Sequence, residues 1–581
     1  MGQLVSSVLG QNYPSDELEY SWKKLMQNHP HDSICCCSVD EVQDEMATRF
    51  NKSKQVADYL VSEGTRYIAD KINTKEYEKY KNALPFVVFN TTGRKRTSVV
   101  SVEIDVTRKS GWLKKCAYDL DEINVPNYKL IDSAGNSIPF KIEDLGVRFG
   151  YDLPKDKFRQ PYMARRVRVT FEAENISAVG YKTYALVEGD AEKVTDTLVS
   201  GENCMENDAI RVEINKNGSL NVTDKASGRT YKGVAYYEET GDLGNEYMYK
   251  MPEGSKAITT QDTVAKIELA EDEPYRAMYK ITNTITVPKS GDDNFEDEKR
   301  HMVFFKERVG GRSNDTVEMK IETFVSLDKN GKGVKIKTRF DNEVKDHRVR
   351  IMVPTGINSD VHKADSVFEV VTRNNRHNAG WNNPSGCEHE QGFVSIDDGE
   401  KGIAVANIGL YEYEMLPDLD NTIAVTILRA VGEMGDWGVL PTPKAQCLGI
   451  SETEIEIVPF KGDLISSGAY EECYQFKTDI ITAATDCHNG AMPLDYSMIN
   501  WQGDGLTLTG IKQKGNGEDI ILRWVNVSDK PTTLTIQKSD VIDNLYISNI
   551  IEKKIKEIDS DNGYFNIEAK TYEIMTVGIA K

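Results

Sequence analysis

The sequence lacks long apolar runs and has fewer basic than acidic residues. A transmembrane helix needs roughly 20 consecutive apolar residues, and no segment approaches that length. Lysine and arginine number 71 against 92 for aspartate and glutamate, so the formal net charge is −21. This charge disfavours nucleic acids and anionic membranes as partners. The first residues also lack the basic and apolar regions of a secretory signal, and we expect a cytoplasmic protein.

Cysteine is scarce, and the common motifs of nucleotide-binding proteins and serine hydrolases are missing. The nine cysteines include no CxxC pair, which argues against a disulfide framework or a cysteine-rich zinc knuckle. The sequence has no P-loop, no dinucleotide-binding fingerprint and no G-x-S-x-G elbow. Beyond His31 the histidines form no HxH, HxxxH or HExxH arrangement. Spacing alone therefore predicts no particular reaction.

Helical periodicity marks the start of the chain. Pro14, Ser15 and Asp16 are typical of a helix start, and apolar residues follow at helical spacing. The opening stretch LVSSVLG is typical of the end of an earlier helix that Gly10 closes. We therefore expect a partial three-helix bundle, with the chain beginning inside a larger unit.

A second helix is predicted after the cysteine run. The stretch Ser38–Glu41 has the S-x-x-E pattern of a capping box, with Ser38 as N-cap and Glu41 reaching back. An apolar stripe follows at helical spacing, which is typical of bundle core. Its members are Val39, Val42, Met46, Val56, Leu60, Tyr67, Ile68 and Ile72.

Beyond Leu84 the pattern changes to short strands separated by turns. Residues Pro85–Arg108 predict strand, turn and strand, rich in valine and threonine. Val334–Phe340 alternates between apolar and polar residues, as a strand with one solvated face does. One short helix is expected within Ala469–Ile481. The fold class predicted is mainly β, with the partial helical bundle followed by antiparallel β-sandwich domains in series.

These changes of pattern divide the chain into four domains. We expect the helical bundle at residues 1–82, a small β-sandwich at 83–190, a large β-sandwich at 204–486 and a C-terminal β-domain at 487–581. The polar run before residue 204 serves as a linker between the two sandwiches.

The stretch HPHDSICCCSVDEV is the one cluster of metal-ligating residue types near the N-terminus. Imidazole and carboxylate groups such as His31 and Asp32 are natural zinc donors, but zinc needs three or four of them. The plainer interpretation is that Asp32 or Ser33 caps a turn and that His31 is partly buried. Three adjacent cysteines, Cys35 to Cys37, cannot all face one ion without strain, and free cysteines commonly act as small hydrophobic residues.

Longer stretches identify what spacing does not. WKKLMQNHPHDSICCCSVDEVQDEMATRF (Trp22–Phe50) resembles the bundle segment of glycoside hydrolase family 38, the α-mannosidases. MENDAIRVEINKNGSLNVTDKASGRTY (205–231) and GDLGNEYMYKMPEG (241–254) resemble the opening of that family's large β-domain. FVSIDDGEKGIAVANIGLYEYEM (393–415), TILRAVGEMG and PTPKAQCLGISETEIEIVPF resemble its later strands. The resemblance covers essentially the whole chain and favours the bacterial branch.

The resemblance implies a zinc-dependent enzyme that removes terminal α-linked mannose with retention of configuration. His31 matches the family's late zinc ligand, and Asp32 matches a residue that hydrogen-bonds the sugar hydroxyls. Tyr247 matches a tyrosine that reaches the sugar from the β-domain, and Arg429 matches an arginine near the same site. The implied partner is a mannose-containing oligosaccharide or a small α-mannoside.

Two departures from the family pattern matter. The family's H-x-D zinc ligands, its aspartate nucleophile and its acid precede the bundle, and no H-x-D occurs in these 581 residues. No catalytic residue is therefore assigned here, and we expect this chain alone to be inactive and to lack stoichiometric zinc. The family also has a glycine where this chain has Cys36, which introduces strain if that position requires a positive φ.

Two other functions compete with this interpretation. The sandwiches could serve only as a carbohydrate-binding or scaffold protein, which would bind sugar without hydrolysis. A redox protein built on Cys35 to Cys37 would need an unusually reactive thiolate. A truncated bundle also exposes apolar surface, which favours a homo-oligomer.

Overall fold

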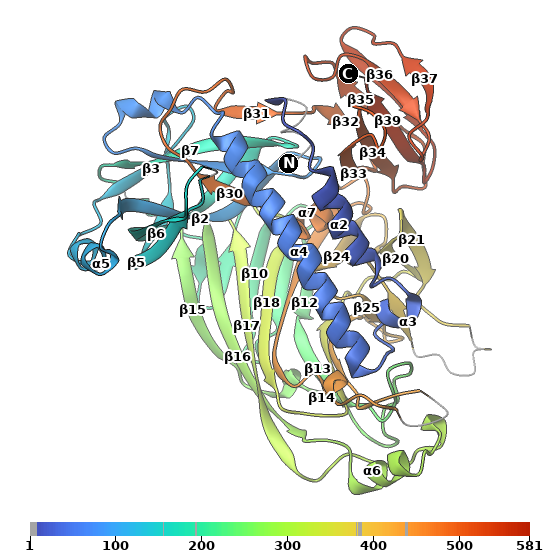
Figure 1. The fold of residues 1–581 in the computed structure, drawn as a ribbon. Coiled ribbons are helices and arrows are strands. Elements are labelled where there is room, and N and C mark those ends of the chain that lie inside the picture. Colours follow the sequence, from blue (N-terminus) through green and yellow to red (C-terminus); the bar gives the residue numbers. More distant parts are fainter. Residues whose placement is uncertain are drawn as a thin grey trace.

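The computed structural model describes residues 9–154, 156–191, 194–378, 380, 386–435 and 440–580. A helical segment at the N-terminus is followed by antiparallel β-sheets that extend to the C-terminus (Figure 1). This confirms the predicted fold class. In the described part of the chain, no helix is long and apolar enough to cross a membrane.

The helical segment consists of α2 (Ser15–Met26), the single turn α3 (His31–Ile34) and the long α4 (Asp40–Ala69). Helices α2 and α4 lie side by side (Figure 1). The Ser21 hydroxyl donates to the Ser53 carbonyl at 3.1 Å, and the buried Asn28 amide donates to the Met46 carbonyl at 3.0 Å. Gly10 has φ +69°, as a helix-closing glycine requires, although the rest of the predicted earlier helix falls at residues 1–8, outside the described ranges.

The predicted capping box does not form. Val39, one residue later than predicted, is the N-cap of α4, with no side-chain cap. The Ser38 hydroxyl instead accepts a hydrogen bond from the Gln43 side chain. The apolar stripe is only partly covered, because Met46 and Ile68 are buried while Val42 is exposed.

The small sandwich packs a six-stranded sheet on a three-stranded sheet. Phe86, Phe171 and Tyr184 form an aromatic cluster between the sheets, with Phe171 and Tyr184 edge to face at 4.8 Å. Its strands are β1 (Leu84–Asn90), β2 (Arg96–Lys109), β3 (Tyr128–Asp132), β4 (Ser137–Ile138), β5 (Phe140–Asp152), β6 (Gln160–Ile176), β7 (Gly180–Glu188), β30 (Ile481–Ala484) and β31 (Asp495–Ser497), with helix α5 (Leu113–Asp121) alongside; η1 (Lys75–Lys79) precedes them.

Strands β30 and β31 come from late in the sequence yet pair with β1 and β7. The boundary predicted between residues 486 and 487 therefore lies inside a segment that belongs to the small sheet. The end of α4 meets the same segment, since the Asn73 amide donates to the Met492 carbonyl and the Met492 amide to the Lys71 carbonyl, both at 2.9 Å.

The large sandwich is built on a nine-stranded, a six-stranded and a five-stranded sheet. β18 alternates between buried and solvated residues as predicted, and α7 confirms the expected short helix. The elements of this region are β8 (Val199–Gly201), β9 (Cys204–Glu206), β10 (Ile210–Ile214), β11 (Leu220–Asp224), β12 (Arg229–Val234), β13 (Tyr236–Gly241), β14 (Ile258–Thr259), η2 (Thr260–Asp262), β15 (Lys266–Glu273), β16 (Arg276–Pro288), α6 (Asp293–Arg300), η3 (Phe305–Glu307), β17 (Thr316–Asp328), β18 (Val334–Asn342), β19 (His347–Val353), β20 (Val361–Ser366), β21 (Glu369–Asn374), β22 (Cys387–His389), β23 (Phe393–Asp397), β24 (Lys401–Asn407), β25 (Glu412–Met415), β26 (Ile423–Ala430), β27 (Glu433–Met434), β28 (Leu440–Pro441), η4 (Pro443–Gln446), β29 (Gly449–Lys461) and α7 (Ala469–Phe476).

The C-terminal domain is a smaller sandwich whose core contains Trp501 and Trp524, edge to face at 5.8 Å. The same apolar core extends into the end of α4 through Ile68 and Ile72 and into the small sandwich through Tyr181. The strands are β32 (Trp501–Gln502), β33 (Leu506–Gln513), β34 (Ile520–Asn526), β35 (Thr532–Gln537), β36 (Leu545–Ser548), β37 (Lys554–Ile558), β38 (Tyr564–Ala569) and β39 (Ile574–Ile579).

Candidate functional site

The pair His31–Asp32 lies on the single helical turn α3, which begins directly after Pro30. Proline is favoured before such a turn because its φ is already fixed near the required value. The His31 Nε2 atom lies 3.3 Å from the Asp32 Oδ1 atom, and the two side chains are 95% and 69% exposed. The expectation of a partly buried His31 is therefore wrong. Both groups face solvent, where they are accessible to a ligand.

The cysteine run turns the chain from α3 into α4. Cys36 has φ +64°, in the left-handed region that glycine adopts most readily. Cys37 is buried, and its Sγ atom lies 3.6 Å from the Glu246 carbonyl oxygen. Burial raises the pKa of Cys37 to about 12 and also raises the pKa of Cys36. Since only the thiolate is a nucleophile, these pKa shifts argue against the redox interpretation.

The segment that Cys37 contacts is the tight loop after β13, which carries Tyr247. The buried Asp242 carboxylate accepts hydrogen bonds from the amides of Gly244 and Lys250 at 2.9 and 3.0 Å. The Asn245 side-chain oxygen accepts from the Tyr247 amide at 2.9 Å. A side chain at position 244 would collide with the Met248 carbonyl. The loop backbone is thus closely fixed, and it presents Tyr247 with 48% of its surface exposed.

Arg429, on β26, holds this loop from behind. Its Nε atom lies 2.8 Å from the Asp242 Oδ2 atom, and its Nη2 atom donates to the Asn245 carbonyl at 2.6 Å. Its Nη1 atom donates to the Glu246 carbonyl at 3.3 Å. These contacts use all three guanidinium nitrogens, so Arg429 orients the backbone that carries Tyr247.

Glu246 lies at the junction of the two loops and was not identified from the sequence. Its Oε2 atom is buried without a hydrogen-bond partner among the described residues. Burial raises the pKa of Glu246, and the neighbouring Thr442 side chain and Ser38 backbone oppose that rise. The only signal for Glu246 in the sequence is its place beside Tyr247 in GNEYMY.

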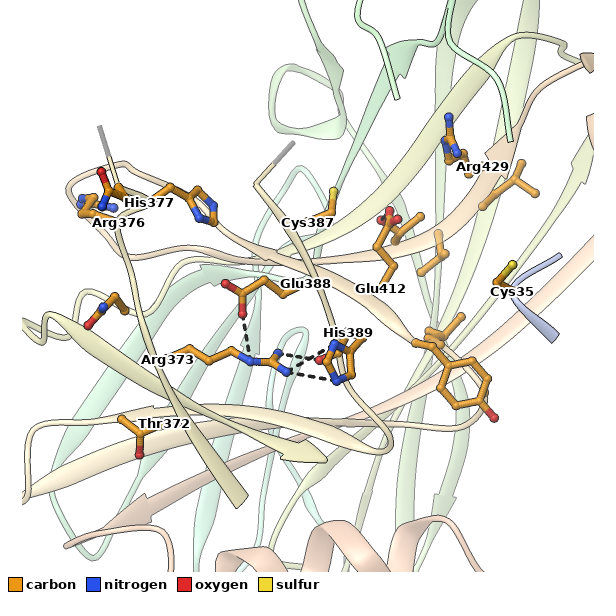
Figure 2. Close-up of a pocket in the computed structure, with 18 residues that line it drawn as sticks. Cys35, Thr372, Arg373, Arg376, His377, Cys387, Glu388, His389, Glu412 and Arg429 are labelled. Carbon is orange, nitrogen blue, oxygen red and sulfur yellow. Dashed lines mark hydrogen bonds and ion pairs between the residues drawn. The ribbon is translucent and has the colours of Figure 1, made fainter. Parts of the chain in front are cut away.

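A cavity of about 1190 Å³ opens beside this junction, with Cys35 and Arg429 at one end (Figure 2). Its floor carries Arg373, whose Nε atom lies 3.1 Å from Glu388 and whose Nη1 atom donates to the His389 carbonyl at 2.6 Å. The cavity is thus lined by guanidinium, imidazole and carboxylate groups, which suit a polar, hydroxyl-rich ligand.

A buried hydrogen-bond chain supports this floor. The Tyr413 hydroxyl lies 2.6 Å from His362 Nε2 and accepts from Arg373 Nη1 at 2.9 Å. His362 Nδ1 lies 2.8 Å from the Asn375 side-chain oxygen. Burial lowers the pKa of His362, so its neutral form is favoured. Arg373 is therefore oriented by the neutral buried groups behind it together with its ion pair to Glu388.

The residues present do not by themselves fit a zinc site. Structural zinc takes four protein ligands and catalytic zinc three. Across the ranges that the structure describes, no group of three or more histidine, cysteine, aspartate or glutamate side chains is arranged to hold a metal ion. His31 and Asp32 supply two donor groups, both at the surface.

The four predicted site residues thus occupy two adjoining segments. Arg429 is in direct contact with the loop of Tyr247, and the loop of His31 and Asp32 reaches it through Cys37. The nine cysteines all lie in the described ranges, and no two of them form a disulfide.

Comparison with known proteins gives three matching family models. They are described as glycosyl hydrolases family 38 C-terminal domain 1 at residues 81–188, the family 38 C-terminal domain at residues 205–434 and the family 38 C-terminal beta sandwich domain at residues 505–577.

Individual relatives agree. A curated protein of Halalkalibacterium halodurans, described as a putative mannosylglycerate hydrolase, is 37% identical over 577 residues, covering 97% of this chain and 63% of that protein. The crystal structure of an alpha-mannosidase from Enterococcus faecalis V583 superposes with TM-score 0.94 at 34% identity, covering 100% of this chain and 65% of that chain. A second Enterococcus faecalis structure, of a protein in glycosyl hydrolase family 38, gives TM-score 0.92 at 34% identity, with coverage of 100% and 68%. The chain thus spans about two thirds of the length of these relatives.

Proposed function

Since the chain belongs to glycoside hydrolase family 38, we propose that it forms the sugar-facing corner of a retaining α-mannosidase. The observation that carries the proposal is the junction of the two loops. Cys37, whose Sγ atom contacts the Glu246 carbonyl, brings the His31–Asp32 turn against the loop that presents Tyr247. The side chains of His31, Asp32 and Tyr247, which can all form hydrogen bonds, therefore lie on adjoining segments at the surface.

In the proposed reaction, terminal α-linked mannose is hydrolysed with retention through a covalent glycosyl-aspartate. Retaining enzymes use one carboxylate as nucleophile and a second carboxyl group as acid and then base, about 5 Å apart. This chain's part is to hold the sugar. The Asp32 carboxylate accepts hydrogen bonds from two mannose hydroxyls, and the Tyr247 hydroxyl fixes the orientation of the ring. Arg429 keeps the backbone of Tyr247 in place, and correct placement of the sugar relative to the nucleophile accounts for a large share of such a rate.

Zinc belongs to the proposal as the family's cofactor, with His31 as one ligand. Two donor groups, His31 and Asp32, do not make a complete zinc site within the described residues, so no chemical step is assigned to the metal. The nucleophile, the acid and the H-x-D ligands are likewise not assigned to any residue of this sequence. We therefore propose that this chain alone does not hydrolyse mannosides.

The cavity beside the junction suggests which aglycone is accommodated. Arg373 and Arg376 line it together with His389. Arg373 is paired with Glu388, and Arg376 donates to two main-chain carbonyls, so these guanidinium groups contribute positive charge to the cavity wall and not a free bidentate site. The Halalkalibacterium halodurans relative is described as a putative mannosylglycerate hydrolase, and mannosylglycerate carries a carboxylate. A short α-mannoside with an anionic aglycone is thus the substrate that we propose to test first, ahead of an N-glycan fragment.

The test uses the chain as it stands. Ligand-observed NMR should detect binding of an α-mannoside, and Asp32→Asn should weaken that binding by about tenfold, equivalent to ~1.4 kcal/mol. An aryl α-mannoside with added zinc should give no turnover. Turnover that survives repurification would contradict the proposed inactivity.

A second candidate is a carbohydrate-binding protein without catalysis. The observation that favours it is the same two-donor set at His31 and Asp32. The two functions are distinguished in a chimeric protein that supplies the remaining family site, since only the first predicts turnover of a mannoside there.

A further inference from the structure

A second cavity, of about 480 Å³, lies between the small sandwich and the C-terminal domain. It shares no lining residue with the cavity beside Arg429. One wall comes from the loop that carries Gly93, Arg94 and Lys95, and the opposite wall comes from β32, β35 and β38.

The walls of this cavity are held rigidly together. The Trp501 indole nitrogen donates to the Gly93 carbonyl at 2.7 Å, and the Arg94 guanidinium lies 3.8 Å from the centroid of the Trp501 ring. Arg94 also donates to the Gly503 carbonyl at 2.6 Å and pairs with Glu471 of α7 at 3.0 Å. Because these contacts join two domains, the cavity is formed in advance of any ligand, which limits the entropy lost on binding.

The wall formed by the sheet presents polar side chains that make no hydrogen bond or ion pair within the described part of the chain. Trp501, Ile536 and Phe565 point into the core, so their neighbours Gln502, Gln537 and Tyr564 point outward. Gln537 and Tyr564 are paired across β35 and β38. In the described part of the chain, the side chains of Gln502, Gln537, Tyr564 and Lys95 have no hydrogen-bond or ion-pair partner, and Tyr564 is 45% exposed.

The chemistry of these groups selects a class of ligand. A carboxamide both donates and accepts, which matches pairs of neighbouring hydroxyl groups, and a tyrosine offers an apolar ring with a polar tip. The one carboxylate of the lining, Glu471, is already paired with Arg94. Lys95 is the single unpaired cation of the described lining, too little charge to define a polyanion site. We propose that this cavity binds a neutral oligosaccharide, as a site separate from the junction at Tyr247.

Calorimetric titration of the 581-residue chain tests the proposal, with linear α-mannotriose and maltotriose as probes. All measurements are made in the Tyr247→Ala background, which weakens sugar binding at the proposed mannose corner. We expect at least one probe to bind. Tyr564→Ala and Gln537→Ala should each weaken binding about tenfold, which corresponds to ~1.4 kcal/mol. Tyr118→Ala, which removes an exposed tyrosine of α5 outside the cavity, should leave affinity unchanged.

Two results would overturn the proposal. One is that neither probe binds in the Tyr247→Ala background. The other is that binding persists unchanged when Tyr564 and Gln537 are both replaced. Thermal melts of each variant establish that it is folded, and Gln537→Glu provides a second, surface-confined change if Tyr564→Ala does not fold. Because hydrolysis is not measured, failure here leaves the proposed mannosidase function to its own test.

Discussion

Single residues decide how the two site loops meet. Cys36 occupies a left-handed backbone position between α3 and α4, and Arg429 holds the loop of Tyr247 through one carboxylate and two carbonyls. The backbone conformation of Cys36 is a local feature of the sequence, whereas the contacts of Arg429 join segments that are far apart in the sequence. Each gives a prediction that a substitution can test.

Replacing Cys36 by glycine should stabilise the protein. A non-glycine residue in the left-handed region costs roughly 1–2 kcal/mol, and part of that gain is offset because glycine makes the unfolded chain more flexible. We expect the free energy of unfolding to rise by about 0.5–1 kcal/mol in urea titrations. Cys35→Gly is the matched control, because Cys35 has φ −78°, and it should be destabilising. Equal effects of the two substitutions would show that backbone strain at Cys36 is not the cause.

Replacing Arg429 by alanine should destabilise the large domain and loosen the loop of Tyr247. Asp242 would then keep a buried carboxylate without its ion-pair partner, and breaking such a buried pair costs about 3 kcal/mol or more. Urea unfolding measures the loss, and hydrogen exchange should increase at residues 244–248. Arg339→Ala removes a paired arginine that is 45% exposed, and its effect should stay below about 0.5 kcal/mol.

At the scale of whole elements, the packing of β29 against α7 and β18 places an acidic group in an unusual position. Glu456 of β29 is buried, and burial, followed by repulsion from Glu472 of α7, raises its pKa to about 8. Lys335 of β18 and Arg96 of β2 oppose that rise, and Asp328 of β17 adds to it. The folded state therefore retains a proton that the unfolded state releases above its usual pKa of 4.5.

This pKa shift predicts a pH-dependent stability with a definite sign. As pH rises from about 4.5 to about 8, the unfolded state loses its proton first, so the free energy of unfolding falls across that window. Glu456→Gln should remove this dependence. Relative to the unmodified chain, its Tm should gain about 4 °C more at roughly pH 8.5 than at roughly pH 5.

The matched control for that measurement is Glu452→Gln on the same strand, where the side chain is 47% exposed. It should shift Tm little at either pH. A Glu456→Gln variant whose advantage is the same at both pH values would contradict the assignment of the pH dependence to Glu456.

The elements also show what sequence alone can and cannot predict. The alternation of β18 and the start of α2 are local patterns, and the structure confirms both. In place of the Ser38 capping box, the Ser38 hydroxyl accepts a hydrogen bond from Gln43, and the adjacent Cys37 contacts the Glu246 carbonyl. The second contact joins residues 209 positions apart, which local pattern does not encode.

The same limit applies to the site. His31, Asp32 and Tyr247 were identified from the family resemblance, yet the exposure of His31 and the supporting role of Arg429 follow only from the packed loops. Arg373 and His389 belong to segments without any recognisable motif, so the cavity that they line could not be predicted.

At the scale of the whole molecule, one apolar core joins three of the domains. Ile72 just after α4, Tyr181 of the small sandwich and Trp524 of the C-terminal domain are all buried in it. We therefore expect these domains to open together. Ile72→Ala should cost about 2–5 kcal/mol, and hydrogen exchange should increase in β34 and β39, far along the sequence from the substitution. Ile551→Ala, at a residue that is 66% exposed, should leave that exchange unchanged. If the C-terminal domain kept its full protection from exchange in Ile72→Ala, that result would contradict a shared core.

The central claim is that this chain supplies the His31–Asp32 corner of a family 38 site. The most direct measurement replaces the matching 577-residue region of the Halalkalibacterium halodurans relative with this chain, and then measures zinc content and turnover of an aryl α-mannoside. We predict a chimera that hydrolyses the mannoside, with His31→Ala lowering zinc affinity and turnover by about 100-fold and Asp32→Asn lowering turnover alone. His29→Ala, two residues away and exposed, should change neither. A folded, active chimera whose zinc content and turnover are unaffected by both His31→Ala and Asp32→Asn would contradict the claim.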